Sequence, residues 1–196
     1  MIHRNSSLLL FMNIWQKKNK VMNLTGITEF QEVLVKHFLD SLACVKAVDM
    51  TKVSKIMDIG TGAGFPGVPL KIAFPHLEAC LLDSLKKRVN FLEETFALLK
   101  LENITAIHGR AEEFAKNKAY REQYDLCVSR AVSNLATLSE YCLPYVKWAE
   151  ILFLTSLARF RKNCSRQKKQ LRSSAARFRM WFILIFRILK SSVLSL

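Results

Sequence analysis

Four of the six glycines in the chain lie within eight residues, in the stretch MDIGTGAGFPGVPL at positions 57–70. Glycine allows left-handed turns and lets the backbone approach a ligand that any Cβ would obstruct. The cluster directly follows a short apolar run, which is the position of the ligand-binding turn after the first strand of an α/β sheet. A dinucleotide and S-adenosylmethionine both bind to such turns, and they imply different chemistry.

The dinucleotide interpretation rests on spacing. Gly62, Gly64 and Gly67 match the pattern G-x-G-x-x-G, and Asp83 follows at about the distance expected of a ribose-binding acid. A nicotinamide-dependent oxidoreductase is therefore one candidate. A glycine-rich turn that binds no ligand is a second, structural explanation.

The neighbours of the glycines favour a methyl donor instead. A bound pyrophosphate would face the start of the following helix. Phe65-Pro66 should fill that space, and Pro66 lacks an N–H donor. Asp58 would repel a diphosphate, but its charge suits the cationic amino group or the sulfonium of S-adenosylmethionine. We therefore expect the methyl donor at this turn.

Further candidate ligands follow the other apolar runs. Asp83 ends the second run, where its carboxylate can accept hydrogen bonds from both ribose hydroxyls. Ala111 and Glu112 follow the third run and are expected beside the adenine, although Glu112 could equally stabilise a helix start. Arg130 closes the fourth run, and we expect it at the rim of the same site.

These residues need an α/β framework to bring them together. Apolar runs predict four strands, and residues spaced by three and four predict the helices between them. Pro69 in a first turn and Pro144 at an end are consistent with helix boundaries. The expected strands are 55–60, 78–83, 104–109 and 124–132, and the expected helices are 30–48, 68–74, 86–101, 111–117 and the segment from 133 that Pro144 closes. The alternation predicts a parallel sheet with helices on both faces.

Composition limits the class of protein. A chain of 196 residues that is 51% hydrophobic can bury one main core. The formal charge is +14, but twelve of the 30 Lys and Arg and one of the 16 acids lie in residues 147–196, which leaves +3 for residues 1–146. That balance is compatible with nucleic-acid binding and does not demonstrate it.

Cysteine usage and hydropathy favour a cytoplasmic protein. The five cysteines are scattered, and neither they nor the four histidines have metal-ligand spacing, so we expect no metal. The start, MIHRNSSLLLFMNIW, resembles a signal peptide but lacks a clear cleavage site. No apolar run reaches the length of a membrane span, and we expect no membrane partner.

Six ordered motifs resemble the bacterial ribosomal RNA small-subunit methyltransferase G (GidB) family. They are NKVMNLTGIT (19–28), VKHFLDSL (35–42), MDIGTGAGFPGVPL (57–70), LLDSLKKRVNFL (81–92), AEEF (111–114) and VSRAVSNL (128–135). The resemblance implies a class I, Rossmann-like methyltransferase fold and S-adenosylmethionine-dependent methylation of guanine N7 in small-subunit (16S) rRNA. It also implies a monomer that acts on the rRNA or the 30S subunit.

Carried over by position, the resemblance implies donor contacts at Gly60, Phe65, Ala111, Glu112 and Arg130. With Gly62 and Asp83 from the arguments above, these residues form the predicted donor site. The segments 37–41 and 23–25 are expected near the substrate opening. Guanine N7 carries a free lone pair, so methyl transfer needs alignment and no general base, and we predict no catalytic residue. A basic RNA-binding protein without activity is a further alternative.

The chain divides into a short helical region (1–50), a donor-binding domain (51–147) and an atypical basic tail (148–196). The 46 residues after Glu150 contain no Asp, Glu, Gly or Pro, which is far from ordinary usage. We hypothesise that translation is out of frame from about Trp148, and that the carboxyl-terminal part of the sheet is incomplete. Impaired activity and an unprotected sheet edge would follow.

Overall fold

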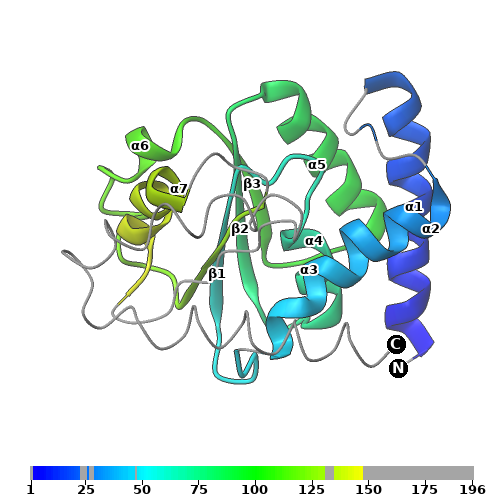
Figure 1. The fold of residues 1–196 in the computed structure, drawn as a ribbon, viewed down its shortest axis with the longest axis horizontal. Coiled ribbons are helices and arrows are strands. Elements are labelled where there is room, and N and C mark those ends of the chain that lie inside the picture. The colour runs from blue at the N-terminus through cyan, green and yellow to red at the C-terminus, as the bar shows by residue number, and fades with distance from the viewer. Residues whose placement is uncertain (1, 23–25, 27–28, 47, 131–134, 148–196) are drawn as a thin grey trace.

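A four-stranded parallel sheet forms the centre of the molecule (Figure 1). The computed structural model describes residues 2–22, 26, 29–46, 48–130 and 135–147. The strand order is β3-β2-β1-β4. The strands are β1 (Lys55–Ile59), β2 (Glu78–Asp83), β3 (Ile104–His108) and β4 (Leu126–Val128). The predicted α/β class and the parallel sheet are therefore confirmed.

The strands are apolar because helices cover both faces of the sheet. Ile56 belongs to the larger core, whereas its neighbours Met57 and Ile59 belong to a second, smaller core on the opposite face. The larger core lies under α1 (Ile2–Met22), α4 (Gly67–Ala73) and α5 (Lys86–Leu99), and the smaller under α6 (Ala111–Phe114) and α7 (Leu135–Cys142). Successive side chains along β1 therefore point alternately into the two cores.

The fourth strand is shorter than predicted. The expected strand spans 124–132, but β4 contains only Leu126–Val128. Ser129 turns its side chain back to the sheet, where Oγ donates a hydrogen bond to the Ile59 carbonyl at 2.6 Å. At the other end, Tyr124 forms an isolated parallel bridge with Val146 rather than a regular ladder. Residues 131 and 132 of the predicted strand lie outside the described part of the chain.

The apolar start of the chain is a helix that completes the larger core. Phe11, Met12 and Trp15 of α1 are at most 4% exposed. The sequence predicted a helical region over residues 1–50 but gave no bounds for a helix before residue 30. The resemblance to a signal peptide therefore reflects a core-facing helix in this structure.

The helix predicted over 30–48 is continuous through residue 46, but its geometry changes along its length. It comprises α2 (Phe30–Val33), the π-helical turn η1 (Leu34–Leu39), α3 (Asp40–Leu42) and the 3₁₀ turn η2 (Ala43–Lys46). Val33 and Phe38 are buried as expected, whereas Phe30, Leu34 and Val45 are 40–48% exposed. The single buried face predicted from regular spacing is therefore wrong. The wider π turn rotates the residues that follow it, which include Val45, whereas Phe30 and Leu34 lie before or at the start of that turn.

The helices after each strand agree with the sequence pattern. In α5, Leu92 and Phe96 are buried in the larger core and Leu99 packs partly against it. After α7, Pro144 lies in the 3₁₀ turn η3 (Leu143–Tyr145), which ends the helical segment where the proline predicted it. These helices fix the loops that follow the strands.

Candidate functional site

The candidate site lies at the carboxyl ends of the strands, where strand order reverses. The chain leaves β1 toward β2 and β3, and returns to the opposite side of β1 as β4. A crevice at such a switch point is the usual ligand position in an open α/β sheet. Gly60 follows β1, Asp83 ends β2, Ala111 follows β3 and Arg130 follows β4. The predicted site residues therefore gather along one edge.

Three glycines of the turn have left-handed backbone conformations. The φ angles are +67° at Gly60, +63° at Gly62 and +92° at Gly64. The turn is attached to the neighbouring strand, because the N–H groups of Gly60 and Thr61 donate to the Leu82 carbonyl at 2.8 and 3.1 Å. Side chains with a Cβ are strained in this region of φ, which explains the glycine cluster.

The space around each glycine shows whether that glycine serves close packing or leaves room for a ligand. A Cβ on Gly64 would lie 2.6 Å from Val68 Cγ2, and one on Gly67 would lie 2.8 Å from Asp58 Oδ2. A Cβ on Gly62 would meet nothing closer than the Gly60 carbonyl oxygen, at 4.0 Å. Gly64 and Gly67 thus serve close packing, whereas Gly62 leaves room for a ligand to approach the backbone.

Asp83 holds the open glycine in place. Its carboxylate is 2% exposed, and Oδ2 accepts hydrogen bonds from the Gly62 N–H at 2.8 Å and Arg88 Nη1 at 3.3 Å. Oδ1 accepts from the Leu85 N–H at 2.9 Å. An ionised carboxylate has about four acceptor positions, so one remains for a hydroxyl group. One position suffices for a single ribose hydroxyl, which is fewer than the two hydroxyls predicted from the sequence.

Asp58 lies beneath the turn rather than in the opening. It is fully buried, and Oδ2 accepts from Thr61 Oγ1 at 2.7 Å and from the Gly67 N–H at 2.8 Å. Oδ1 has no hydrogen-bond partner among the described residues. Desolvation raises the pKa of this carboxyl to about 6, against the opposing effect of its hydrogen bonds. Asp58 therefore holds the turn through Thr61 and Gly67, whereas the sequence argument considered only the attraction of its charge for a cationic donor group.

The same contacts argue against the dinucleotide interpretation. The Gly67 N–H at the start of α4 already donates to Asp58 and is not available to a pyrophosphate. The helix itself contains only seven residues. Gly64 packs against α4 and α5 side chains instead of facing a ligand.

Phe65 points away from the opening into an aromatic cluster. It is 4% exposed and stacks on the His37 ring at a centroid distance of 5.0 Å. The rings of Phe11 and Phe38 lie at 5.3 and 5.2 Å. Pro66 stands at the N-cap of α4, whereas the ring of Phe65 is buried in this cluster. The backbone is the part of Phe65 that remains for the predicted donor contact.

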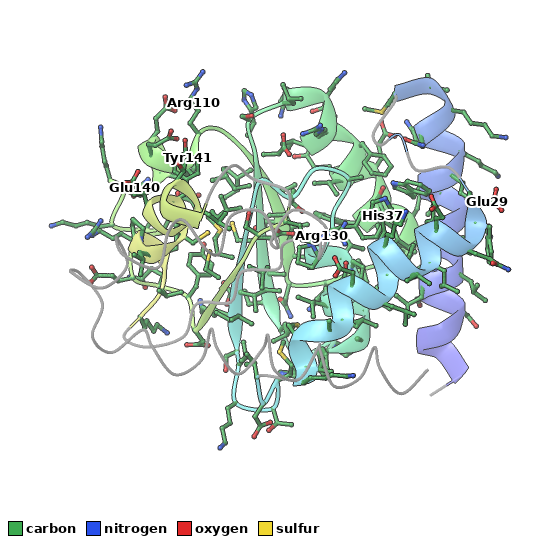
Figure 2. All side chains as sticks on the ribbon, in the orientation of Figure 1. Glu29, His37, Arg110, Arg130, Glu140 and Tyr141 are labelled. Carbon is green, nitrogen blue, oxygen red and sulfur yellow. The ribbon has the colours of Figure 1, made fainter. Side chains whose placement is uncertain are left out.

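Arg130 is enclosed by the helical segment 30–46, as the labelled side chains in Figure 2 show. Its Nη1 donates to the carbonyl oxygens of Lys36 and His37, both at 3.1 Å, and to Asp40 Oδ2 at 3.2 Å. Nη2 lies 2.9 Å from His37 Nδ1, and the guanidinium carbon lies 5.2 Å from the centre of the Phe65 ring. The side chain is 11% exposed. Arg130 is thus at the predicted edge but is not an exposed rim residue.

Burial and charge determine the protonation of this cluster. Desolvation, followed by the charges of Arg130 and Lys36, lowers the pKa of His37 to about 4. A guanidinium can only donate hydrogen bonds, so His37 Nδ1 accepts the hydrogen bond from Arg130 Nη2. The proton of the neutral imidazole is therefore on Nε2. Desolvation also raises the pKa of Asp40, although Arg130 opposes the shift.

Two tyrosines hold the loop after β3. Tyr145 donates a hydrogen bond to the Ala111 carbonyl at 2.6 Å and is completely buried. Glu112 lies in the exposed first turn of α6, and its hydrogen bond with the Tyr141 hydroxyl raises the pKa of that tyrosine. Figure 2 shows Tyr141 and Arg110 at this end of the molecule. The sequence argument did not identify either tyrosine, because no spacing relates them to residue 111.

The sequence also led to expectations about metal sites, membrane spans, the segment 23–25 and the tail. Within residues 2–22, 26, 29–46, 48–130 and 135–147, no three His, Cys, Asp or Glu side chains gather as a metal site. In the same part of the chain, no helix is long and apolar enough to cross a membrane. The segment 23–25 and the tail 148–196 lie outside the described residues.

Comparison with known proteins identifies relatives over most of the chain. The family described as GidB, rRNA small subunit methyltransferase G, matches residues 4–181, a wider range than the residues 19–135 over which the six motifs lie. The chain is 53% identical over 142 residues to "Ribosomal RNA small subunit methyltransferase G" of Alkaliphilus oremlandii, which covers 72% of this chain and 59% of that protein. A protein of the same name from Thermoanaerobacter sp. is 58% identical over 129 residues, covering 66% and 54%.

The fold has solved counterparts at low sequence identity. A methyltransferase from Geobacter sulfurreducens superposes with a TM-score of 0.58 at 13% identity, covering 81% of this chain and 80% of that one. The chain spans about three fifths of the length of the curated relatives that it matches. From the glycine turn and its partners, the parallel sheet and the extent of the match, the chain belongs to the GidB family of rRNA small subunit methyltransferases G.

Proposed function

We propose that this chain binds S-adenosylmethionine and takes part in methylation of guanine N7 in small-subunit (16S) rRNA. Membership of the family supports the reaction class, and the name that the relatives share supports the rRNA substrate. The activity is a proposal because the chain spans about three fifths of those relatives.

The observation that carries the proposal is the pairing of Gly62 with Asp83. Gly62 is left-handed and open on its outer side, and its N–H is fixed by a carboxylate that retains acceptor capacity. A ribose can therefore approach bare backbone beside a fixed acceptor without displacing any packed side chain. The proposed donor site comprises Gly60, Gly62, Phe65, Asp83, Ala111, Glu112 and Arg130.

The donor would supply an electrophilic methyl group on a sulfonium. The protein's part is alignment, because guanine N7 already offers a lone pair and needs no deprotonation. Hydrogen bonds that hold the backbone on both sides of the candidate site suit this requirement. The glycine turn is tied to β2, and Ser129 ties the end of β4 to the end of β1. We accordingly assign no catalytic base.

The exposed basic residues at the same edge support an rRNA substrate. Lys86 and Lys87 begin α5 just beyond Asp83, and Arg110 follows β3; all three side chains are exposed. Cations placed there can contact phosphates around a base held in the crevice. We further propose that the protein acts as a monomer on rRNA or the 30S subunit, in the cytoplasm where that substrate occurs.

Calorimetric titration of the full chain tests the donor assignment. S-adenosylhomocysteine should bind and NAD should give no heat. Binding of NAD alone would overturn the choice in favour of the oxidoreductase. Transfer of labelled methyl from S-adenosylmethionine to 30S subunits that lack the modification tests the second step. Donor binding without any transfer would indicate the non-catalytic RNA-binding alternative.

We also propose that translation is out of frame from about Trp148, which leaves the sheet incomplete and impairs activity. The absence of Asp, Glu, Gly and Pro after Glu150 supports the shift in frame. The incomplete sheet is supported by the parallel bridge between Tyr124 and Val146, which continues in the Lys147 N–H donating to the Tyr124 carbonyl at 2.8 Å. This pairing is how a further strand beside β4 would begin. Reading the gene in the other two frames after codon 147 tests the hypothesis. Absence of a Gly-Gly turn followed by an apolar strand in both frames would reject it.

A further inference from the structure

The contacts of Arg130 connect two parts of the chain that lie about ninety residues apart. Arg130 follows β4, whereas Lys36, His37, Asp40 and Ser41 belong to the helical segment 30–46. Nη1 reaches Ser41 Oγ at 3.4 Å in addition to the two carbonyls and the Asp40 carboxylate. The Arg130 and His37 side chains adjoin in Figure 2. One guanidinium therefore fastens this segment to the edge of the site.

The helix geometry favours this attachment. The contacted carbonyls, of Lys36 and His37, lie within the π turn Leu34–Leu39. A π turn replaces the usual i→i+4 bonds by i→i+5 bonds, and the Asp40 N–H accordingly reaches back to the Val35 carbonyl. Such turns are frequent at functional sites. Here the widened turn presents two adjacent carbonyls to the same nitrogen.

The attachment also reaches the glycine turn. The His37 ring stacks on Phe65 at an interplanar angle of 22°, and the guanidinium carbon of Arg130 lies over the same ring. Phe65 directly follows Gly64. The position of the guanidinium is thus fixed by a carboxylate, an imidazole nitrogen and an aromatic face, each from a separate side chain.

We propose that Asp40 and His37 are positioning residues that act through Arg130 to preform the donor site. This inference rests on the proposed function. A long, unrestrained arginine would lose side-chain entropy on binding a ligand, and fixing it beforehand removes that cost. Asp40 supplies the opposite charge, and His37 supplies a neutral acceptor for the second nitrogen. Neither residue needs to touch the donor.

A double-mutant cycle with S-adenosylhomocysteine as the probe tests the inference. Asp40→Ala should weaken binding about tenfold when Arg130 is present, because the guanidinium loses its charged partner. In the background of Arg130→Met, which keeps an apolar stem over Phe65, the same substitution should change the affinity less than about twofold. Equal losses in both backgrounds would show that Asp40 acts independently of Arg130 and would overturn the inference.

Two further variants guard against a purely structural effect. Asp40→Asn keeps an acceptor for Nη1 and should weaken binding by only about threefold, and it replaces Asp40→Ala in the cycle if that variant does not fold. Glu32→Ala removes a carboxylate from the same segment, but its partner is Lys36, and its side chain is 49% exposed. This control should bind the probe as the wild type does.

The outcomes separate the inference from the proposed function. If the wild-type chain binds no S-adenosylhomocysteine, the proposed function fails and the inference falls with it. If the wild type binds the probe and Asp40→Ala binds it equally well, only the inference is overturned.

Discussion

The two sides of the candidate site are built by different means. On the β1–β2 side, the turn is held by backbone geometry and by two buried carboxylates that accept nearby N–H groups. On the β4 side, Arg130 is held by side chains and carbonyls from a helical segment near the start of the chain. One side is local and backbone-based, whereas the other is long-range and side-chain-based.

This difference has energetic consequences. Close packing around Gly64 and Gly67 leaves no room for added atoms, so that side should respond steeply to single substitutions. On the other side, Arg130 is bound by several partners at once. Removing one of these partners should therefore cost less stability. The cluster also contains groups with shifted pKa values, which makes it sensitive to pH.

The largest effect is expected for Gly64→Ala. Its φ is +92°, and the new Cβ would lie 2.6 Å from Val68 Cγ2 and 2.9 Å from Leu92 Cδ2. We expect the free energy of unfolding to fall by about 3 kcal/mol, measured by urea denaturation. Gly26→Ala is the control, because nothing lies within 4 Å of its added Cβ. Equal stabilities for the two variants would contradict close packing at Gly64.

Gly62→Asp should instead act on binding. The added carboxylate enters open space at φ +63°, so the cost in stability should be only about 1 kcal/mol. We expect a loss of at least about 100-fold in affinity for S-adenosylhomocysteine, or about 2.7 kcal/mol, by calorimetry. An unchanged affinity would remove the glycine turn from the donor site.

Arg130→Ala should lower both stability and donor affinity. The substitution leaves the partly buried Asp40 carboxylate without its cation, and we expect a loss of about 2 kcal/mol in the free energy of unfolding. The exposed-rim position expected from the sequence predicted no such loss. Arg121→Ala is a matched control, since the side chains of Arg121 and its ion-pair partner Glu122 are 49% and 60% exposed. Similar small losses for both variants would show that the Arg130 cluster is not a structural anchor.

The smallest expected effect is the pH dependence due to His37. Its folded-state pKa, about 4, lies below the ordinary 6.5, so its contribution is fully present above pH 6.5 and is lost as pH falls toward 4. The raised pKa values of Asp58 and Asp40 act in the opposite direction, because protonation favours the folded state there. Wild-type stability at one pH is therefore not informative by itself.

The comparison with His37→Gln isolates this contribution. Urea unfolding of both proteins at pH 7.5 and pH 5 should show the wild type losing stability relative to the variant at the lower pH. Burial of His37 is incomplete, so solvent screening should keep the difference below that of the preceding predictions. A difference that does not change with pH would mean that His37 is solvated in the folded state.

Much of the framework could be predicted because its causes are local. The bounds of β2 agree with the sequence pattern, and the start of β1 and the start of β3 were predicted correctly. Buried parallel strands read as short apolar runs, and glycines and prolines mark the intervening turns. Residues 1–50 were predicted to be helical, but neither the bounds of Ile2–Met22 nor its buried face was predicted, since its buried residues contact elements that follow much later in the chain.

The amino-acid sequence alone determined the α/β alternation, the glycine turn and the acid at the end of the second strand. These features depend on residue type and spacing within a few positions. Only the tertiary structure decided that Gly62 is open while Gly64 is packed, that Asp58 lies beneath the turn, and that Arg130 binds the segment around Asp40. The physical reason is that each of these depends on contacts between segments distant in sequence, and no local pattern encodes which surfaces meet.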